Sequence, residues 1–417
     1  MDQFSFLRAC LASTLVIACN VTAAQSLRLD EAVIRTLESN PELAAFAYEL
    51  KAQQGRVQQA GARAPIEVGM LVENAFGTGS RSSLDAAETT LSLDFMLEHG
   101  ALQRRRESAL AGGDVLEAEL KIKRIDVAAE TSRRFITMLE EQQLIAELRH
   151  ARELAQQTLE AVQLRVKAAR VPQAEEARAQ ASLARARLEE EHAEHELLAG
   201  RRRLAALWGH LDADFSEASG SLSNLPPMPA FESLRAELDK NPDFERFVSE
   251  QRLRETELRV AETRRRPPWQ LMTGVRRFEQ GDDHAFVVGL TVPLPSRDYA
   301  QGAIAQARAQ LDQVDAHRQA KRVQLDAELF GIYQEIKHAY TEVATLRDDV
   351  LPKLEQAVEE SRYAYERGRY SYVEWAAAQR ELLEMRRSLS AAYANVHRYR
   401  VEIERLTGAS LNARTLR

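Results

Sequence analysis

Two histidines in an acidic stretch are the residues whose types and spacing come closest to a metal ligand set. His192 and His195 stand among Glu191, Glu194 and Glu196. A spacing of three residues in a helix puts both imidazoles on one face, where they could bind a cation together. The same composition is typical of a solvated helix surface. That is the interpretation we favour, so the sequence predicts no metal site.

Other catalytic chemistry lacks its motifs in this sequence. It contains no nucleophile–base arrangement, no glycine-rich phosphate loop and no cysteine-rich metal motif. We therefore expect neither an enzyme nor a bound cofactor. The formal net charge is -7, and charges of both signs are mixed along the chain, which gives no reason to expect nucleic-acid binding.

The N-terminal residues predict an export signal over residues 1–24. Arg8 precedes an apolar stretch from Ala9 to Ala18, and small residues offer a cleavage site after Ala24. The stretch is shorter than the roughly 20 apolar residues of a permanent helical anchor. No later segment of the sequence reaches that length without charges.

Both cysteines of the chain, Cys10 and Cys19, lie in this signal. Cleavage after Ala24 leaves no thiol for a disulfide or for catalysis. The residues Val16-Ile17-Ala18-Cys19 also resemble a bacterial lipoprotein cleavage box. Lipidation of Cys19 is therefore an alternative to removal of the whole signal.

The rest of the sequence contains one large internal repeat. Asn40-Pro41 recurs as Asn241-Pro242, 201 residues later, and Ala169–Gly209 matches Gly368–Gly408 at an offset of 199. We predict a first repeat over residues 25–209, an extended linker over residues 210–230, a second repeat over residues 231–409 and a tail over residues 410–417.

Each repeat is predicted to hold a helix, two strands and a long helical pair, the first helix running from Leu27 to Arg63. Apolar and polar residues alternate in four segments of about nine to ten residues, the length of a tilted strand across a membrane. The positions predicted to share one face are Ile66, Val68, Met70 and Val72; Leu91, Leu93, Phe95 and Leu97; Trp269, Leu271, Thr273 and Val275; and Phe286, Val288, Leu290, Val292 and Leu294. A soluble sheet with one wet face would alternate in the same way.

The helical pairs are predicted to be very long. Ala101–Arg170 contains no proline, and a helix of about 65 residues is about 100 Å long, which suits a structure that crosses a gap. Both pairs carry a narrow apolar stripe of coiled-coil type. The stripe positions are Leu144, Leu148, Ala151, Ala155, Leu159, Val162 and Val166, and in the second repeat Leu325, Leu329, Ile332, Ile336, Tyr340 and Val343. Pro352 is predicted to kink the second rod.

Four strands cannot close a barrel, and lipid does not tolerate an open sheet edge. Two copies would give eight strands, whose interior is filled by side chains, whereas three copies give twelve strands and a pore. The predicted fold class is therefore mainly α with a membrane β-barrel. Four strands per chain would close a 12-strand barrel in a homotrimer, continued by a long α-helical coiled-coil tunnel.

Several short motifs occur in a fixed order along the chain. They are Leu29-Asp30-Glu31-Ala32 with Asn40-Pro41, Val72-Glu73-Asn74, Ala87-Glu88-Thr89-Thr90-Leu91-Ser92-Leu93, Gly274-Val275-Arg276-Arg277-Phe278, and Val292-Pro293-Leu294-Pro295 with Gly302-Ala303-Ile304-Ala305. In this order they resemble the TolC family of outer-membrane efflux proteins, and most of all its cobalt–zinc–cadmium branch. The branch often has a Gly-Gly-Lys-Arg element after the second strand, where this chain reads Glu98-His99-Gly100-Ala101-Leu102.

The resemblance implies a homotrimer in the outer membrane of a Gram-negative bacterium. Its barrel would be surrounded by outer-membrane lipid. Its helical part would lie in the periplasm, docked to a periplasmic adaptor (membrane fusion) protein and to a proton-driven inner-membrane pump of the RND type. In the family the turns between the long helices form the tip that contacts the adaptor. These turns map to Ala169 and Arg170, and to Gly368, Arg369 and Ser371.

The resemblance also places a gate at this tip, because acidic residues after the second turn ring the closed entrance in some members. Glu374 occupies that place, Glu175 is its partner in the first repeat, and Tyr370 is positioned to pack neighbouring helices together. An alternative is that Glu374 lies on an exposed helix face and pairs with an arginine.

The predicted function is that of a passive exit duct for heavy-metal cations. A duct for organic toxins or drugs is the alternative within the same class. A periplasmic coiled-coil adaptor or scaffold is the alternative from a different class, and the four alternating strands argue against it. The sequence does not identify the ion.

Overall fold

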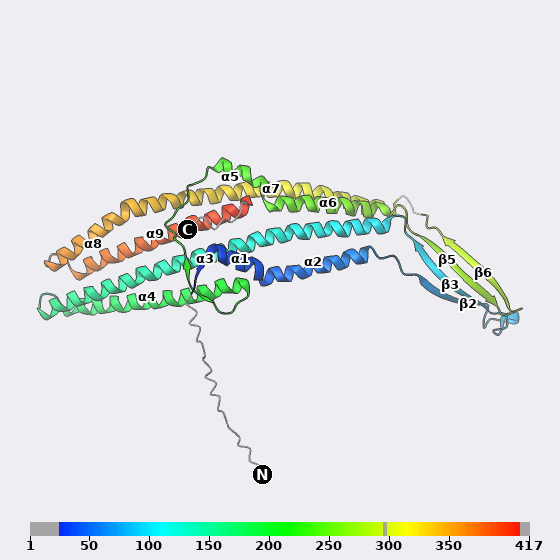
Figure 1. The fold of residues 1–417 in the computed structure, drawn as a ribbon, viewed down its shortest axis with the longest axis horizontal. Coiled ribbons are helices and arrows are strands. Elements are labelled where there is room, and N and C mark those ends of the chain that lie inside the picture. Colours follow the sequence, from blue (N-terminus) through cyan, green and yellow to red (C-terminus); the bar gives the residue numbers. More distant parts are fainter. Residues whose placement is uncertain (1–24, 295–297, 409–417) are drawn as a thin grey trace, which may run out of the picture.

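The computed structural model describes residues 25–294 and 298–408, which form a long helical rod with a small sheet at one end (Figure 1). The first series of elements is β1 (Gln25–Arg28), α1 (Leu29–Ser39), α2 (Pro41–Ala60), β2 (Glu67–Glu73), β3 (Glu88–Leu97), α3 (Ala101–Lys167), α4 (Gln173–Ala205) and β4 (Phe215–Ser219). The second is α5 (Phe231–Glu237), α6 (Pro242–Thr263), β5 (Trp269–Phe278), β6 (Asp283–Thr291), α7 (Gln301–Thr345), α8 (Leu351–Glu366) and α9 (Tyr372–Thr407). The predicted signal, Cys19 and the tail over 410–417 lie outside the described residues.

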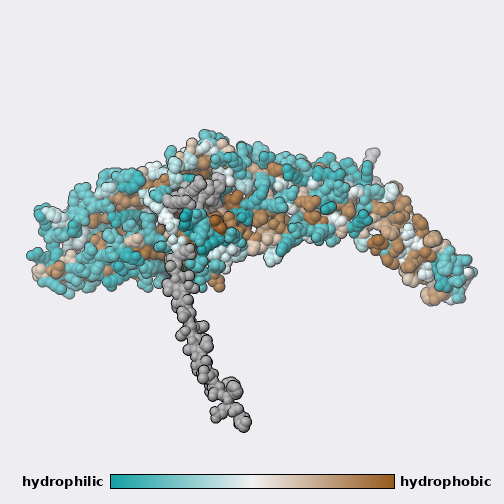
Figure 2. Space-filling model, viewed as in Figure 1, coloured by the Kyte–Doolittle hydropathy of each residue, from teal (hydrophilic) through white to brown (hydrophobic). Residues whose placement is uncertain are grey.

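The sheet at the end of the rod is antiparallel, in the order β2-β3-β5-β6. Its register aligns Val68 with Leu93, Leu93 with Thr273, and Thr273 with Val288. Side chains at paired positions point to the same face, so the predicted apolar positions of these four strands do share one face. Val68 and Val288 are 71% and 72% exposed, and Figure 2 shows apolar residues over most of this end of the molecule.

The structure differs from three of the predicted elements. The helix expected from Leu27 to Arg63 is a strand, β1, followed by α1 and by α2, which ends at Ala60. The linker over 210–230 contains β4, which pairs in parallel with β1 and buries Leu27 and Phe215. The last strand ends at Thr291, so Val292 and Leu294 lie beyond it. The pairing of β1 with β4 joins segments that are distant in sequence, and local periodicity does not report such contacts.

The two asparagines of the repeated Asn-Pro motif perform the same structural task twice. The Asn40 side chain accepts hydrogen bonds from the backbone N–H groups at the start of α2 and donates one to the carbonyl of Leu207, at 2.8 Å. The Asn241 side chain caps α6 and donates to the carbonyl of Leu406, at 2.7 Å. Each asparagine therefore ties the start of a short helix to the end of a long one, which explains why both sequence motifs are repeated.

A glycine stands two residues after each of these two leucines. Gly209 and Gly408 have φ angles of 79° and 66°, in the left-handed region that favours glycine at a helix end. At Gly408 an added Cβ would lie 2.7 Å from the carbonyl oxygen of Lys240. The C-terminal end of α9 thus lies so close to the Asn241 turn that position 408 has no room for a side chain.

The coiled-coil stripes predicted for the long helices are buried or half-buried. Leu325, Leu329 and Ile336 are buried in one core cluster, and Leu159 and Val162 in another. The predicted kink at Pro352 takes the form of a π-helical turn, Leu346–Val350, between α7 and α8. A proline cannot donate to the preceding turn, and the wider turn before it accommodates the lost hydrogen bond.

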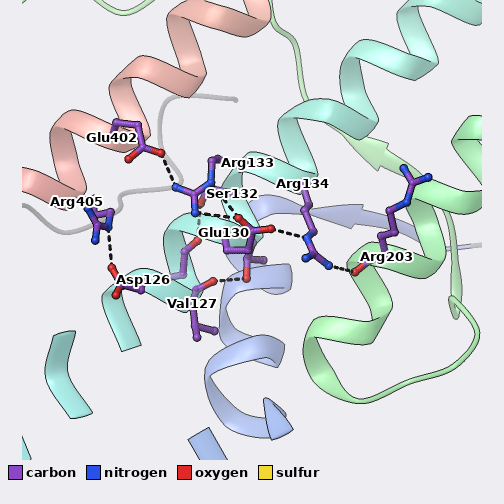
Figure 3. A network of polar contacts seen from close by, with 11 residues as sticks. Asp126, Val127, Glu130, Ser132, Arg133, Arg134, Arg203, Glu402 and Arg405 are labelled. Carbon is purple, nitrogen blue, oxygen red and sulfur yellow. Dashed lines mark hydrogen bonds and ion pairs between the residues drawn. The ribbon is translucent and has the colours of Figure 1, made fainter. Parts of the chain in front are cut away.

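A polar network joins α3 to α9 near the middle of the rod (Figure 3). Arg133 lies between Glu130, at 2.9 Å, and Glu402 of α9, at 2.5 Å. Arg405 of α9 pairs with Asp126, at 2.7 Å. Burial disfavours the charge of Glu130, yet hydrogen bonds from Arg134 and Arg133 lower its pKa. The first repeat is therefore connected to the second by charged contacts as well as by the apolar core.

The Asn241 side chain is expected to be necessary for the attachment of α6. Asn241→Ala removes a helix cap, at about 1 kcal/mol, and leaves the buried carbonyl of Leu406 without its donor, at about 1–3 kcal/mol. We expect the free energy of unfolding to fall by about 2–4 kcal/mol, measured by denaturant unfolding followed by circular dichroism. Asn241→Asp keeps the cap and loses only the donor. A stability of Asn241→Asp equal to that of the wild type would contradict the proposed role of the Leu406 contact.

Candidate functional site

The face of the sheet opposite the apolar one is polar and internally hydrogen-bonded. Arg276 lies near the end of β5 and forms ion pairs with Glu73, at 3.0 Å, and with Glu88, at 2.9 Å. The same guanidinium donates to the hydroxyl of Thr90, at 2.8 Å, and Ser92 donates to the carboxylate of Asp94, at 3.1 Å. The sheet thus has one face suited to hydrocarbon and one suited to water.

Glycines keep part of this polar face free of side chains. Gly69, Ser92 and Gly274 are neighbours across three strands. A Cβ added at Gly274 would lie 2.5 Å from the backbone carbonyl oxygen of Leu91, and one at Gly69 would lie 2.7 Å from the hydroxyl of Ser92. The strands approach one another so closely here that larger residues would force them apart.

Both outer edges of this sheet are unpaired within the described residues. Strand β2 pairs only with β3, and β6 only with β5. The outward N–H and C=O groups of β2 and β6 therefore have no strand partner in the protomer. An apolar sheet face beside open edges would leave backbone groups unsatisfied in hydrocarbon.

At the opposite end of the rod an aromatic cluster joins the two helical hairpins (Figure 1). The Tyr365 side chain, 1% exposed, stacks on Trp375 with ring centroids 5.2 Å apart. The guanidinium of Arg165 lies 4.6 Å from the Tyr365 ring centroid and also donates to the Tyr365 carbonyl. The Tyr365 hydroxyl donates to Glu175, at 3.3 Å. We call Arg165, Glu175, Tyr365 and Trp375 the tip clasp.

Burial is the main reason why the pKa of Tyr365 is raised to about 12, and the adjacent Glu175 carboxylate adds to this effect. The phenol therefore stays protonated at every physiological pH and keeps donating its hydrogen bond. Sequence reasoning missed Arg165, Tyr365 and Trp375. The internal repeat was the available signal for these residues, because it places both hairpin turns at the same end of the rod.

The predicted gate residues are not equivalent in the structure. Glu175 belongs to the tip clasp. Glu374 closes a capping box at the start of α9, where it accepts hydrogen bonds from the Ser371 backbone N–H, at 2.7 Å, and from the Ser371 hydroxyl, at 2.9 Å. These two hydrogen bonds lower the pKa of Glu374. Glu374 is thus hydrogen-bonded to Ser371 rather than paired with an arginine, and Tyr370 is exposed.

The predicted tip residues occupy the two turns between the long helices. Ala169 and Arg170 follow α3, and Gly368, Arg369 and Ser371 follow α8. All five are exposed. Ala169 has a φ of 55° and Gly368 a φ of 74°. Both residues are therefore left-handed, but the first turn has an alanine at this position and the second a glycine.

The two candidate metal ligands lie on the surface of α4. His192 and His195 are both exposed. Within residues 25–294 and 298–408 no three His, Cys, Asp or Glu side chains are arranged to hold a metal ion. Nor is any helix in these ranges long and apolar enough to cross a membrane.

A helical rod that ends in a two-faced sheet with open edges defines the protomer of a TolC-like outer-membrane channel. Residues 234–409 match the family model described as outer membrane efflux protein. The chain is also 28% identical, over 93% of its length and 91% of the relative's, to the cobalt-zinc-cadmium resistance protein CzcC of Cupriavidus metallidurans. The chain is thus similar to outer-membrane efflux proteins over nearly its whole length, and these comparisons indicate a channel rather than an enzyme.

Solved structures have the same fold at low sequence identity. The outer membrane protein VceC of Vibrio cholerae superposes with a TM-score of 0.72 at 16% identity, over 92% of this chain and 97% of that one. The CmeC outer membrane channel of Campylobacter jejuni gives 0.73 at 14% identity, over 93% and 87%. These likenesses support a mainly helical fold with few strands.

The left-handed Ala169 is expected to weaken the first tip turn. Ala169→Gly releases about 1–2 kcal/mol of backbone strain, against about 0.4–1 kcal/mol lost through the greater freedom of the unfolded chain. We expect a net gain of about 0.5–1 kcal/mol, seen as amide exchange in this turn slowed by about two- to fivefold. Gly368→Ala, the matched change in the other turn, should speed exchange there. Unchanged amide exchange in both variants would contradict the proposed backbone strain at Ala169.

Proposed function

We propose that three copies of this chain close a 12-strand barrel in the outer membrane and form a duct that passively conducts heavy-metal cations to the exterior. The observation that carries the proposal is the sheet with one apolar face, one polar face and two open edges. Joining β6 of one copy to β2 of the next would satisfy the open edges. It would place Val68, Leu93 and Val288 toward lipid and Arg276 toward the pore.

The similarity to the cobalt-zinc-cadmium resistance protein CzcC supports heavy metals as the cargo. We infer that the pore conducts without a tight metal site, because an ion must leave a channel as readily as it enters. We further propose that the periplasmic hairpin turns, at Ala169 and Arg170 and at Gly368, Arg369 and Ser371, contact an adaptor protein. That adaptor would couple the duct to an RND-type inner-membrane pump.

An introduced charge can test which face of the strands points toward lipid. Leu93→Arg places a guanidinium on the apolar face, at about 2–4 kcal/mol near the middle of a bilayer, whereas Asp94→Arg changes the neighbouring residue on the polar face. We expect Leu93→Arg to abolish trimer assembly and Asp94→Arg to preserve it, measured by membrane fractionation and by mass in mild detergent. Equal assembly of both variants would contradict the facing, and a soluble monomeric wild type would favour the scaffold alternative.

The gate assignment is a separate part of the proposal. In a trimer three copies of Glu374 would converge near the axis and attract passing cations, while Tyr370, exposed in the protomer, would pack against a neighbouring copy. We expect Glu374→Ala to weaken divalent-cation block and Tyr370→Ala to raise conductance, both measured on single channels in a bilayer.

The capping box supplies the control for this experiment. Ser371→Ala removes the hydroxyl that donates to Glu374 and weakens the helix start, at about 1 kcal/mol, but it keeps the carboxylate and the backbone N–H that also donates to it. Its cation block should therefore match that of the wild type. If Ser371→Ala and Glu374→Ala behave alike, the effect comes from the helix cap and the gate assignment fails.

The cargo is tested by deletion of the gene from its host. We expect the strain to become more sensitive to zinc, cobalt or cadmium, in a panel that also contains nickel, copper and silver. The wild-type chain should restore resistance and the Leu93→Arg variant should not. Sensitivity to organic toxins with unchanged metal tolerance would support the organic-cargo alternative instead.

A further inference from the structure

The segments that join the helical rod to the sheet carry exposed arginines at one end of the rod (Figure 1). They come from the α2–β2 connection, from the start of α3 and from the α6–β5 connection. We call Arg63, Arg104, Arg106, Arg264, Arg265 and Arg266 the arginine collar. These segments are neighbours, since a Cβ added at Gly61 would lie 3.5 Å from Cδ of Arg106 and Leu97 is aligned with Trp269. One surface therefore combines arginines from three connections.

Most of these arginines lack an acidic partner in the part of the chain that the structure describes. Arg104 pairs with Glu107, at 3.0 Å, and the adjacent Arg105 pairs with Glu98, at 2.7 Å. The other members of the collar form no ion pair there. The further carboxylates close to these connections in sequence are Glu67, Glu262 and Asp298. A guanidinium is ionised at every physiological pH, so the collar has an excess of positive charge.

Helix stability does not explain the arginines at the start of α3. The N-terminus of a helix carries a partial positive charge, which favours acidic residues and disfavours cations in the first turn. The helices α2, α4, α6 and α9 follow this rule and have acidic residues there. The two helices that begin next to the sheet, α3 and α7, have none, and α3 has Arg104 as its fourth residue. This helix start is therefore suited to an anion from outside the chain.

The collar lies just beyond the apolar face of the sheet. Strand β5 has 10 residues, which at about 3.3 Å per residue and a tilt of about 40° cover about 25 Å, the height of the apolar band of a membrane barrel. Trp269, its first residue, is 40% exposed and packs edge-on against His99 with ring centroids 4.8 Å apart. Tryptophan is enriched where hydrocarbon meets lipid headgroups. Arg266 is three residues before Trp269, so the collar lies at the level of the phosphates.

The opposite end of the sheet has the reverse charge balance. The loops that connect β2 to β3 and β5 to β6 contain Asp85, Glu279 and Asp282 against one arginine, Arg81. The two ends of the strands therefore differ in sign, and the end next to the rod is the one that attracts anions.

We propose that the arginine collar binds the headgroups of anionic phospholipids in the membrane leaflet next to the rod. A guanidinium pairs with phosphate through two parallel hydrogen bonds. Phosphatidylglycerol has a net negative charge, whereas phosphatidylcholine is neutral overall, so the excess positive charge of the collar selects the first. The inference rests on the proposed membrane position of the sheet and specifies which lipid surrounds it.

Trp269 can report which lipid lies beside the collar. The chain has three tryptophans, and the other two, Trp208 and Trp375, are buried within the rod and the tip. The full chain is reconstituted in vesicles of phosphatidylglycerol and phosphatidylcholine, with one or the other brominated at the same acyl carbons to quench fluorescence. We expect phosphatidylglycerol to be enriched about fivefold beside Trp269. Salt at about 0.5 M should reduce this preference. Inorganic phosphate at the concentration of the headgroups should not, which separates a lipid surface from a free-phosphate site.

Two sets of charge-matched variants test the collar itself. Arg264→Gln, Arg265→Gln and Arg266→Gln combined should reduce the preference about threefold or more; these side chains have no ion pair to lose among the described residues. The control combines Arg178→Gln, Arg185→Gln and Arg318→Gln, which are exposed arginines of the rod, and should keep the preference. Arg63→Gln with Arg106→Gln tests the other connections and replaces the first variant if that variant does not insert. Trp269→Phe should remove the quenching by both lipids.

Equal quenching of the wild type by the two brominated lipids would overturn the proposal and leave the membrane position of the sheet standing. A preference that survives in both collar variants, or that falls equally in the rod control, would overturn it as well. Absence of quenching by either lipid would show that Trp269 lies outside the membrane, which contradicts the proposed position of the sheet and the lipid contact together.

Discussion

The repeated hydrogen bond from an asparagine amide to the last leucine carbonyl of a hairpin determines the layout of this molecule. Asn40 reaches Leu207 and Asn241 reaches Leu406, so each short helix begins where a long one ends. From that level α2 and α6 run to the sheet, while α4 and α9 reach the same level from the tip (Figure 1). Because one amide caps a helix and satisfies a second chain segment, neither motif tolerates a simple replacement. The sheet and the tip are therefore positioned at opposite ends of one rod.

Because of its open edges, the sheet requires strands from other copies of the chain. Its four strands have an apolar face of the kind that lipid accepts, yet their outer edges lack partners in the protomer. Hydrogen bonds that one chain cannot make must come from further strands. Arg276, held by Glu73 and Glu88, shows that the opposite face is built to stay hydrated. The export function proposed above follows from this division of the sheet into two faces.

Local patterns predicted much of this fold and less of the candidate site. Alternation placed Leu93 and Val288 on one face because the period of a strand is visible over a few residues. The repeat pointed to Asn40 and Asn241 without revealing what they bind. The pairing of β1 with β4 and the tip clasp could not be predicted in this way. Arg165 and Tyr365 are 200 residues apart, and the partner of a long-range contact leaves no local periodicity.

The forces that hold the two hairpins together are unevenly distributed along the rod. Between the network in Figure 3 and the tip, α3 and α4 meet α9 through half-exposed ion pairs such as Arg387–Glu189 and Arg386–Glu147. Each such pair contributes about 0–1 kcal/mol. The tip clasp instead buries Tyr365 of α8 against Arg165 and Glu175 of the other hairpin, and burial of such a side chain contributes about 1.5–3 kcal/mol. If the hairpins separate to open the entrance of a duct, the clasp is the contact that resists them most, and the ion pairs along the rod re-form with little loss.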